Sequence, residues 1–177
     1  MTKSIIVISG LPASGKTTLA RLLGEELRFA VIDKDDFLQV LLGPVHEFDA
    51  DFRFKCSREA DIQFEEAARA AGDVILVSHW QGPDEHRESG TPSAWLREFD
   101  HVIEIVCHCS VATALARFRN RNRHPGHGDN RSDLGELQRW FEEDSLRGPL
   151  DIGSLITVNT EAIVDIRKFA LDCRQFA

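Results

Sequence analysis

The sequence lacks any long apolar run, and none of its hydrophobic stretches approaches the roughly 18 residues that a membrane-spanning helix needs. Its first residues, MTKSIIVISG, have the pattern of a strand and contain no charged segment followed by an apolar leader. We therefore expect a cytoplasmic protein that has no contact with a membrane.

Cysteine is scarce, and none of the four cysteines forms a C-x-x-C spacing. Cys107 and Cys109 lie two apart on an expected strand, and such a pair without further ligands is a weak signal for a metal. We expect all of the cysteines to be reduced and structural. They are Cys56, Cys107, Cys109 and Cys173.

The chain also lacks internal repeats, low-complexity tracts and linkers rich in Pro, Gly or Ser, so we expect residues 1–177 to form a single domain. Basic residues are outnumbered, and the net charge is -8. Because phosphate contacts need clustered Lys and Arg, we expect no general affinity for nucleic acid. The sequence does not decide between a monomer and a dimer.

Short apolar runs alternate with helical patterns from end to end, which is typical of a parallel α/β protein. The runs that we interpret as strands are residues 4–9, 29–33, 73–78, 101–107 and 154–159. Only Glu104 interrupts one of these runs, and the pattern gives no functional reason for it. The prediction is a three-layer α/β/α sandwich around a five-stranded parallel sheet.

Helices are expected between the strands. Their predicted ranges are 16–28, 52–71, a segment after Ser110, a segment after Asp133, and about 161–176. Ser110 is suited to cap the first of the two later segments, and Asp133 with Glu136 forms a capping-box pattern. Gly72 is suited to a left-handed cap at the end of the helix over 52–71.

The segment GLPASGKT, residues 10–17, matches the G-x-x-x-x-G-K-[ST] phosphate loop and lies between an expected strand and an expected helix. Glycines let the backbone wrap around phosphate, and the amides of residues 13–18 lie at the positive end of the helix dipole. Lys16 is expected to reach the β- and γ-phosphates, and the Thr17 hydroxyl to ligate Mg²⁺. The predicted nucleotide-binding residues here are Gly10, Ala13, Ser14, Gly15, Lys16, Thr17 and Thr18.

Acidic residues follow the second expected strand in the order Asp33, Lys34, Asp35 and Asp36. The third strand ends in Ser78, where a Walker B motif has an acid, so another carboxylate must hold Mg²⁺ or accept a proton. Asp33 and Asp35 are the nearest candidates, because the carboxyl ends of parallel strands form the ligand site of open sheets. We expect Asp33 to ligate the metal and Asp35 to orient a hydroxyl, although either could be the base. Asp36 fits a helix first turn better.

Four arginines lie within seven residues, at Arg117, Arg119, Arg121 and Arg123. On a helix, Arg117 and Arg121 share one face and the other two share another, so one pair can face the nucleotide. A break containing Pro and Gly follows at residues 124–130. A basic helix leading into such a loop is typical of a lid that closes over a triphosphate, here over about residues 117–133.

Three potential metal ligands lie in that loop, namely His124, His127 and Asp129. They lack the spacing of established zinc sites, so we interpret them as lid residues. An acceptor wall is expected from residues 78–81 and 40–53, with polar and aromatic groups that are His79, Trp80, His86 and Arg87. Trp80 fits equally well as a residue packed under its loop.

The pairing of ISGLPASGKTTLA with VIDKDDF resembles the P-loop kinases that include chloramphenicol phosphotransferase, gluconate kinase, zeta toxins and the kinase half of polynucleotide kinase. The resemblance implies the strand order 2-3-1-4-5, bound ATP and Mg²⁺, and a substrate-orienting role for Asp35. It also implies that Arg117 and Arg121 are lid arginines, with Arg123 as a third, and that adenine lies near Thr160. Leu38 stands where polynucleotide kinases tend to have an arginine.

These observations favour transfer of the γ-phosphoryl group from ATP to a hydroxyl of a small molecule, with Lys16, Asp33, Asp35 and Arg121 as catalytic residues. Two alternatives stay open. One is a polynucleotide 5′-hydroxyl kinase. The other is an ATP-binding module without catalysis, which the missing Walker B acid favours and the lid arginines disfavour. The sequence does not name the acceptor or distinguish ATP from GTP.

Overall fold

A computed structural model of the chain describes residues 3–44, 49–85, 89–121 and 133–175. All five strands are parallel and form one sheet in the order β2-β3-β1-β4-β5. They are β1 (Ile5–Gly10), β2 (Ala30–Asp33), β3 (Val74–Val77), β4 (Val102–His108) and β5 (Ser154–Asn159). The predicted sandwich and the strand order that the resemblance implied are confirmed.

The central position of β1 explains why its sequence is apolar without interruption. β1 pairs with β3 through Ile5 and Val74 and with β4 through Ile5 and Val102. A parallel strand between two others has both faces covered by helices, so each of its side chains is buried. Ile5 and Val7 pack on one face of the sheet and Ile6 and Ile8 on the other.

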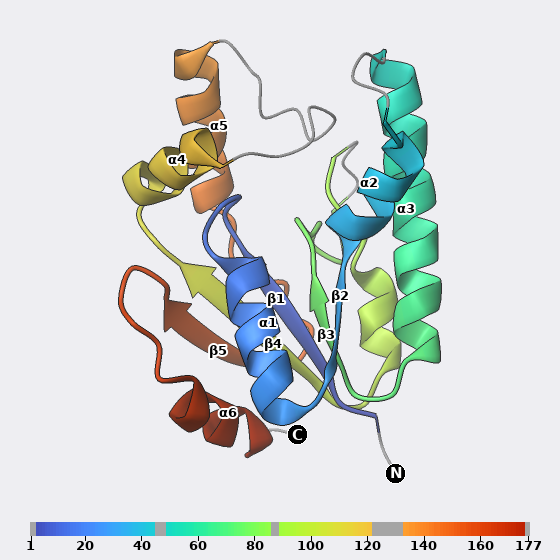
Figure 1. Cartoon of the computed structure of the whole chain (residues 1–177), viewed down its shortest axis with the longest axis vertical. Coiled ribbons are helices and arrows are strands. Elements are labelled where there is room, and N and C mark those ends of the chain that lie inside the picture. The colour runs from blue at the N-terminus through green and yellow to red at the C-terminus, as the bar shows by residue number, and fades with distance from the viewer. Residues whose placement is uncertain (1–2, 45–48, 86–88, 122–132, 176–177) are drawn as a thin grey trace.

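Helices cover both faces of the sheet (Figure 1). They are α1 (Lys16–Leu27), α2 (Lys34–Leu42), α3 (Ala50–Ala70), α4 (Val111–Asn120), α5 (Leu134–Ser145), α6 (Ile166–Arg174) and a short 3₁₀ helix, η1 (Ala94–Glu98). α1 and α6 pack on the face of Ile6 and Ile8, and α3 and η1 on the opposite face. None of the helices in these ranges is long and apolar enough to cross a membrane.

Two of the predicted helix caps are confirmed. The Ser110 side chain accepts a hydrogen bond from the Thr113 amide at 3.2 Å and begins α4. Asp133 accepts from the amides of Gly135 and Glu136 at 2.8 and 2.9 Å and begins α5. A short polar side chain at these positions satisfies backbone donors that the helix itself leaves unpaired.

Other boundaries differ from the prediction. α3 ends at Ala70 with an extended Ala71, so Gly72 is not a left-handed cap, whereas Arg28 closes α1 at φ 61°. α6 begins at Ile166 and not near residue 161, because the Asp165 side chain caps it by accepting from the Lys168 amide. α2 had no predicted bounds, but the expectation that Asp36 lies in the first turn of a helix is confirmed.

Glu104 is buried in β4 and has a structural reason to be there. Its carboxylate accepts a hydrogen bond from the Ser9 hydroxyl at 2.8 Å and from the Leu150 amide at 2.8 and 3.0 Å. A buried carboxylate needs such donors to replace water. Glu104 therefore ties the segment after α5 to the middle of the sheet.

The four cysteines are unpaired and buried, as expected for structural thiols. Burial raises the pKa of the Cys107 thiol to about 12.

Candidate active site

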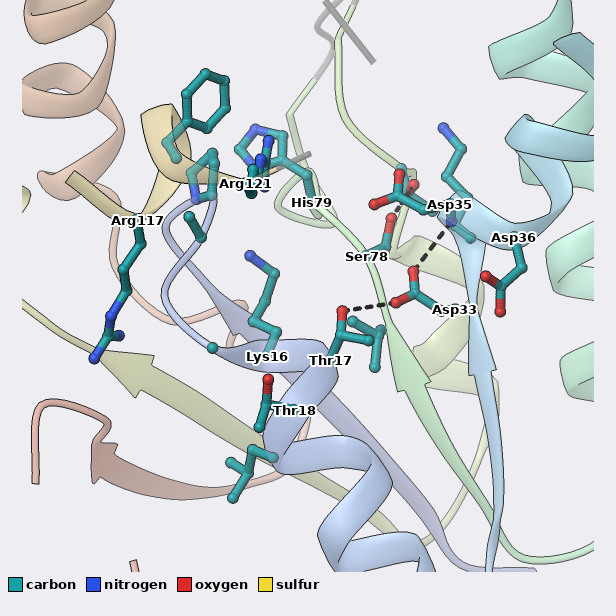
Figure 2. Close-up of a pocket in the computed structure, with 18 of the residues that line it drawn as sticks. Lys16, Thr17, Thr18, Asp33, Asp35, Asp36, Ser78, His79, Arg117 and Arg121 are labelled. Atoms are coloured by element: carbon teal, nitrogen blue, oxygen red, sulfur yellow. Dashed lines mark hydrogen bonds between the residues drawn. The ribbon is translucent and has the colours of Figure 1, made fainter. Parts of the chain in front are cut away.

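The strand order brings the ends of β1, β2 and β3 to the same edge of the sheet, and the predicted phosphate loop lies there (Figure 2). The loop makes a tight turn in which the Ser14 amide donates to the Leu11 carbonyl at 3.1 Å. Gly10 and Gly15 have φ of 127° and 94°, and Ala13 has φ 59°. A side chain at Gly10 would meet the backbone of Cys107, so the turn has room only for glycine there.

The first turn of α1 presents backbone donors toward the loop. The earliest backbone hydrogen bond of α1 joins the Leu19 amide to the Gly15 carbonyl at 2.9 Å, and Gly15 supplies no side-chain cap. The amides of Lys16, Thr17 and Thr18 precede that bond and have no helical carbonyl to pair with. Together with the helix dipole they form a site suited to an anion.

The Lys16 ammonium group folds back over the loop and donates to the carbonyls of Gly10 and Leu11 at 2.8 and 2.7 Å. Burial lowers the pKa of Lys16, while the negative charges of Asp35, Asp144 and Asp33 act in the opposite direction. The Lys16 ammonium is therefore desolvated. It can release its two carbonyl partners and bind phosphate oxygens instead.

Asp33 joins the phosphate loop to the acidic segment. Its Oδ2 accepts from the Thr17 hydroxyl at 2.8 Å, and its Oδ1 accepts from the Asp35 amide at 3.1 Å, which makes Asp33 the N-cap of α2. Burial, and next the charge of Asp35, raise the pKa of Asp33, while the two hydrogen bonds oppose that rise. The structure thus brings together the two residues predicted to hold a metal.

Asp35 and Asp36 occupy the first turn of α2 and point in different directions. Figure 2 shows the Asp35 carboxylate on the side of the helix that faces the phosphate loop, and the Asp36 carboxylate turned away from Lys16. Both residues line a pocket of about 1020 Å³ that also contains Lys16, Thr17 and Asp33. The pocket extends from the loop after β5 to α3, which gives room for a nucleotide and a second substrate.

The arginines are not arranged as predicted. α4 ends at Asn120, and Arg121 is extended beyond it, so Arg117 and Arg121 do not share a helical face. The Arg117 guanidinium donates to the Thr160 carbonyl at 2.9 Å, and the Arg121 guanidinium lies 4.1 Å from the centre of the Phe118 ring. Both residues line the pocket, whereas Arg119 is exposed.

Several predictions fall outside the described residues. They concern Arg123, His124, His127 and Asp129, most of the proposed lid, and the acceptor-wall residues His86 and Arg87. Trp80 is buried, and its indole donates to the Ile8 carbonyl at 3.0 Å, so it packs under the loop.

Sequence reasoning missed a buried ionic cluster at the wall of the pocket. The Lys34 ammonium lies 2.8 Å from Asp61 and 2.9 Å from the Ser57 hydroxyl, and Arg58 lies 2.9 Å from the other Asp61 oxygen. Asp61 also accepts from the Thr91 hydroxyl at 2.9 Å. Lys34 stands between the predicted functional acids, but no local pattern links it to α3.

A second cluster surrounds His79, which lies two residues after the end of β3. Arg147 Nη1 lies 3.3 Å from His79 Nε2 and donates to Asp144 Oδ1 at 2.9 Å, while Arg147 Nη2 donates to Glu85 at 2.6 Å. His79 lines the large pocket and also a smaller cavity of about 250 Å³ beside it. The sequence predicted His79 at the acceptor wall, and the structure adds the residues that hold it.

Comparisons with known proteins agree with this fold. Over residues 5–143 the sequence matches the family described as AAA domain, whereas a search of curated proteins finds no match. A provisionally assigned kinase from Chloroflexus aurantiacus j-10-fl aligns over 100% of both chains at 23% identity, with a TM-score of 0.76. A shikimate kinase from Bacteroides thetaiotaomicron aligns over 98% of each chain at 15% identity, with a TM-score of 0.64.

A gluconokinase from Sinorhizobium meliloti 1021 aligns over 98% of this chain and 94% of its own at 16% identity, with a TM-score of 0.60. Identities of this size establish the shared architecture alone, and the family match covers the phosphate loop, the acidic segment and α4. The chain belongs to the AAA domain family and has the fold of the P-loop kinases.

Proposed function

We propose that this protein is an ATP- and Mg²⁺-dependent phosphotransferase that moves the γ-phosphoryl group to a hydroxyl of a small molecule. The observation that carries the proposal is the 2.8 Å hydrogen bond from the Thr17 hydroxyl to Asp33, with Asp35 and Lys16 in the same pocket. The proposal is supported by one cavity that is lined by the predicted phosphate loop, by the two residues proposed as metal ligands and by a second carboxylate. In this proposal residues 1–177 act as one catalytic domain, with a lid over about residues 117–133.

The phosphate loop fits a triphosphate in two ways. The unpaired amides at the start of α1 and the desolvated Lys16 ammonium offer donors and positive charge. The Ser14 hydroxyl is buried and, within the described part of the chain, has no hydrogen-bond partner. Buried polar atoms normally have a hydrogen-bond partner. The lack of one at this hydroxyl supports the proposal that a bound ligand completes the hydrogen bonding of the loop.

Thr17 and Asp33 fit Mg²⁺, because both supply the hard oxygen ligands that this ion prefers. Asp33 is also already held in place by the Asp35 amide. When bound, Mg²⁺ would neutralise negative charge on the β- and γ-phosphates. The chain's own contribution is to keep these two oxygens adjacent at the mouth of the phosphate loop.

Asp35 has the position of the group that orients the acceptor. In the transfer step, the acceptor oxygen forms a bond to the γ-phosphorus while the bond from that phosphorus to the bridging oxygen of ADP breaks. Asp35 accepts the hydroxyl proton, and Lys16, Arg117 and Arg121 stabilise negative charge on the phosphoryl oxygens. Arg123, which lies outside the described residues, is proposed to stabilise the same negative charge.

A small acceptor is favoured over a polynucleotide. The net charge of -8 opposes the approach of a phosphate backbone, and the reacting groups lie inside a pocket of about 1020 Å³. Gluconokinase and shikimate kinase, which share the fold, are named for small hydroxylated substrates.

The test is transfer of labelled phosphate from γ-labelled ATP with Mg²⁺ to a panel of hydroxylated metabolites and a 5′-hydroxyl oligonucleotide. We expect a labelled small-molecule product with the wild type and none with Asp35→Asn, which should still bind ATP. Asp36→Asn is the matched control, because this carboxylate of the same turn faces away from Lys16, and it should retain transfer. Full activity of Asp35→Asn would remove Asp35 from its role. ATP binding without any product would favour a non-catalytic module.

A further inference from the structure

His79 stands between the phosphate loop and the second-substrate side of the pocket. It follows β3, and β3 lies between β1, which leads into the phosphate loop, and β2, which ends at Asp33. Figure 2 shows its side chain above the phosphate loop in that view, whereas the side chain of Ser78 lies toward Asp35. The imidazole packs 6.1 Å from the Trp140 ring, which lines the same pocket.

The surroundings of His79 fix which ring nitrogen carries the proton. Arg147 Nη1 lies 3.3 Å from His79 Nε2, and a guanidinium group has only donors. Arg147 is itself held by Glu85 and Asp144, so it cannot readily turn away. Nε2 must therefore accept, and in the neutral ring the proton resides on Nδ1.

The ring is also kept uncharged. Burial lowers the pKa of His79 to about 4, and the positive charges of Lys16, Arg147 and Lys34 act in the same direction. Asp144, with Oδ1 3.6 Å from Nε2, opposes the shift but does not overcome it. At neutral pH His79 is thus a neutral side chain with one N–H donor whose direction is fixed.

Two hydroxyls that line the same pocket as His79, those of Ser78 and Thr91, are already engaged. Ser78 and Thr91 share a hydrogen bond of 2.6 Å, and Thr91 donates its own proton to Asp61 at 2.9 Å. Since Thr91 donates to Asp61, Ser78 must donate to Thr91. Neither hydroxyl proton is available to a ligand. Among the residues that the structure describes, the polar contacts of the His79 ring all involve Nε2, which leaves the Nδ1–H as a neutral donor at this pocket.

We propose that His79 determines acceptor specificity by donating from Nδ1–H to a second, uncharged oxygen of the acceptor while Asp35 orients the reacting hydroxyl. This inference rests on the proposed phosphotransferase function. A neutral donor suits a hydroxyl, ring or carbonyl oxygen, because an anion would gain more from a cation such as Lys or Arg. The acceptor class is therefore polyhydroxylated compounds, such as sugars and polyols, in which another oxygen lies near the reacting one.

The first test needs no acceptor and does not depend on the activity. Nitrogen-15 NMR of the imidazoles in the full chain, with His79 assigned by the loss of its signals in His79→Asn, reports the tautomer directly. We expect a protonated Nδ1 and an unprotonated Nε2 at pH 7. A protonated Nε2, or a charged ring at that pH, would overturn the proposal. Addition of a non-hydrolysable ATP analogue with Mg²⁺ should leave the Nδ1–H signal in place, and a large shift would assign the donor to phosphate instead.

The second test uses isosteric variants on sugars and polyols that the wild type phosphorylates. An Asn amide nitrogen occupies the place of His Nδ1, whereas a Gln amide occupies that of Nε2. We expect His79→Asn to retain most of kcat/KM for the acceptor and His79→Gln to lose about tenfold, as for one hydrogen bond, with ATP affinity unchanged in both. Equal losses in the two variants would contradict the assignment.

Deoxy analogues of the same acceptors identify the contacted oxygen. Removal of that oxygen should cost the wild type about tenfold in kcat/KM and should cost His79→Gln nothing further. If the loss from the deoxy analogue and the loss from His79→Gln simply add for every analogue, the proposed contact is wrong. The proposed phosphotransfer would still stand. Failure of the protein to bind ATP at all would instead contradict the proposed function, so the two failures are distinguishable.

Discussion

The Lys34 ammonium and the Asp61 carboxylate form an ion pair of 2.8 Å in which neither side chain is more than 10% exposed. The pair joins the first residue of α2 to the middle of α3, and its lysine lies between Asp33 and Asp35 in the sequence. Because the start of α2 carries both carboxylates of the proposed active site, the position of those carboxylates depends on this contact.

Breaking the pair from one side should be costly. Asp61→Asn leaves the Lys34 cation buried without its counter-charge, and we expect a loss of about 3–5 kcal/mol in the free energy of unfolding, measured by urea denaturation. The exposed pair of Arg69 and Glu98 provides the control, since Glu98→Gln should change stability by less than about 1 kcal/mol. A loss at Asp61 as small as the control's would show that water reaches Lys34.

Two glycines give a matched test of backbone conformation. Gly10 has φ 127° and lies against the Cys107 backbone, so Gly10→Ala should distort the phosphate loop, lower stability and abolish ATP binding. Gly72 is not in the left-handed region and has open space around it, so Gly72→Ala should raise stability by about 0.4–1 kcal/mol. Thermal unfolding and calorimetry with ATP measure both. A destabilised Gly72→Ala would argue for a left-handed Gly72 after all.

Lys16 should contribute to nucleotide affinity through its charge. Lys16→Ala removes a desolvated cation that can exchange two carbonyl partners for phosphate oxygens, and a charge-assisted hydrogen bond contributes about 1.5–3 kcal/mol. We expect at least about a tenfold loss in ATP affinity by isothermal calorimetry with Mg²⁺. Lys55→Ala, which removes an exposed lysine of α3, should bind as the wild type does. Unchanged binding by Lys16→Ala would sink the assignment of the loop.

Asp33 should oppose stability and support function. Its pKa is raised in the folded protein, so the native state holds that proton more tightly than the unfolded state, and the stabilisation is present below the usual range of an Asp. It is lost as the pH rises through the raised pKa. The amide of Asp33→Asn does not ionise, so the variant does not lose stability as the pH rises. We therefore expect it to have a higher Tm than the wild type at neutral pH.

The same variant should weaken Mg²⁺-dependent ATP binding, because a neutral amide replaces a charged ligand. In the wild type, that binding should weaken as the pH falls through the raised pKa of Asp33, since metal ligands must be deprotonated. Differential scanning calorimetry and nucleotide titrations between acidic and neutral pH check both trends. A lower Tm together with full Mg²⁺ dependence would contradict this account.

The sequence predicted correctly what local patterns encode. The run from Ile5 to Ile8 is apolar on both faces because it is central in a parallel sheet, and that same property makes it visible without a structure. Ser110 and Asp133 were identified as caps because a cap bonds to amides two or three residues away. The proposed site at the strand ends rests on the same kind of local signal.

The errors arose where a local signal competed with packing. Regular helical spacing placed Arg117 and Arg121 on one face, but α4 ends at Asn120 and the Arg121 side chain lies over Phe118. The last helix begins later than expected, at Ile166, because the Asp165 side chain caps it there. The segment before it instead contacts the phosphate loop, where the Thr160 hydroxyl donates to the Ser14 carbonyl at 2.6 Å. Helix propensity alone contains no information about that contact.

By itself, therefore, the sequence determined the order of strands and helices, the phosphate loop and the acidic segment, since each depends on residues within a few positions of one another. Only the tertiary structure decided that Lys34 pairs with Asp61, that Glu104 holds Leu150, and that Arg147 lies against His79 from 68 residues away. Such contacts depend on how the packed elements bring side chains together that are far apart in the sequence. The periodicity of the sequence contains no information about which distant residues will meet.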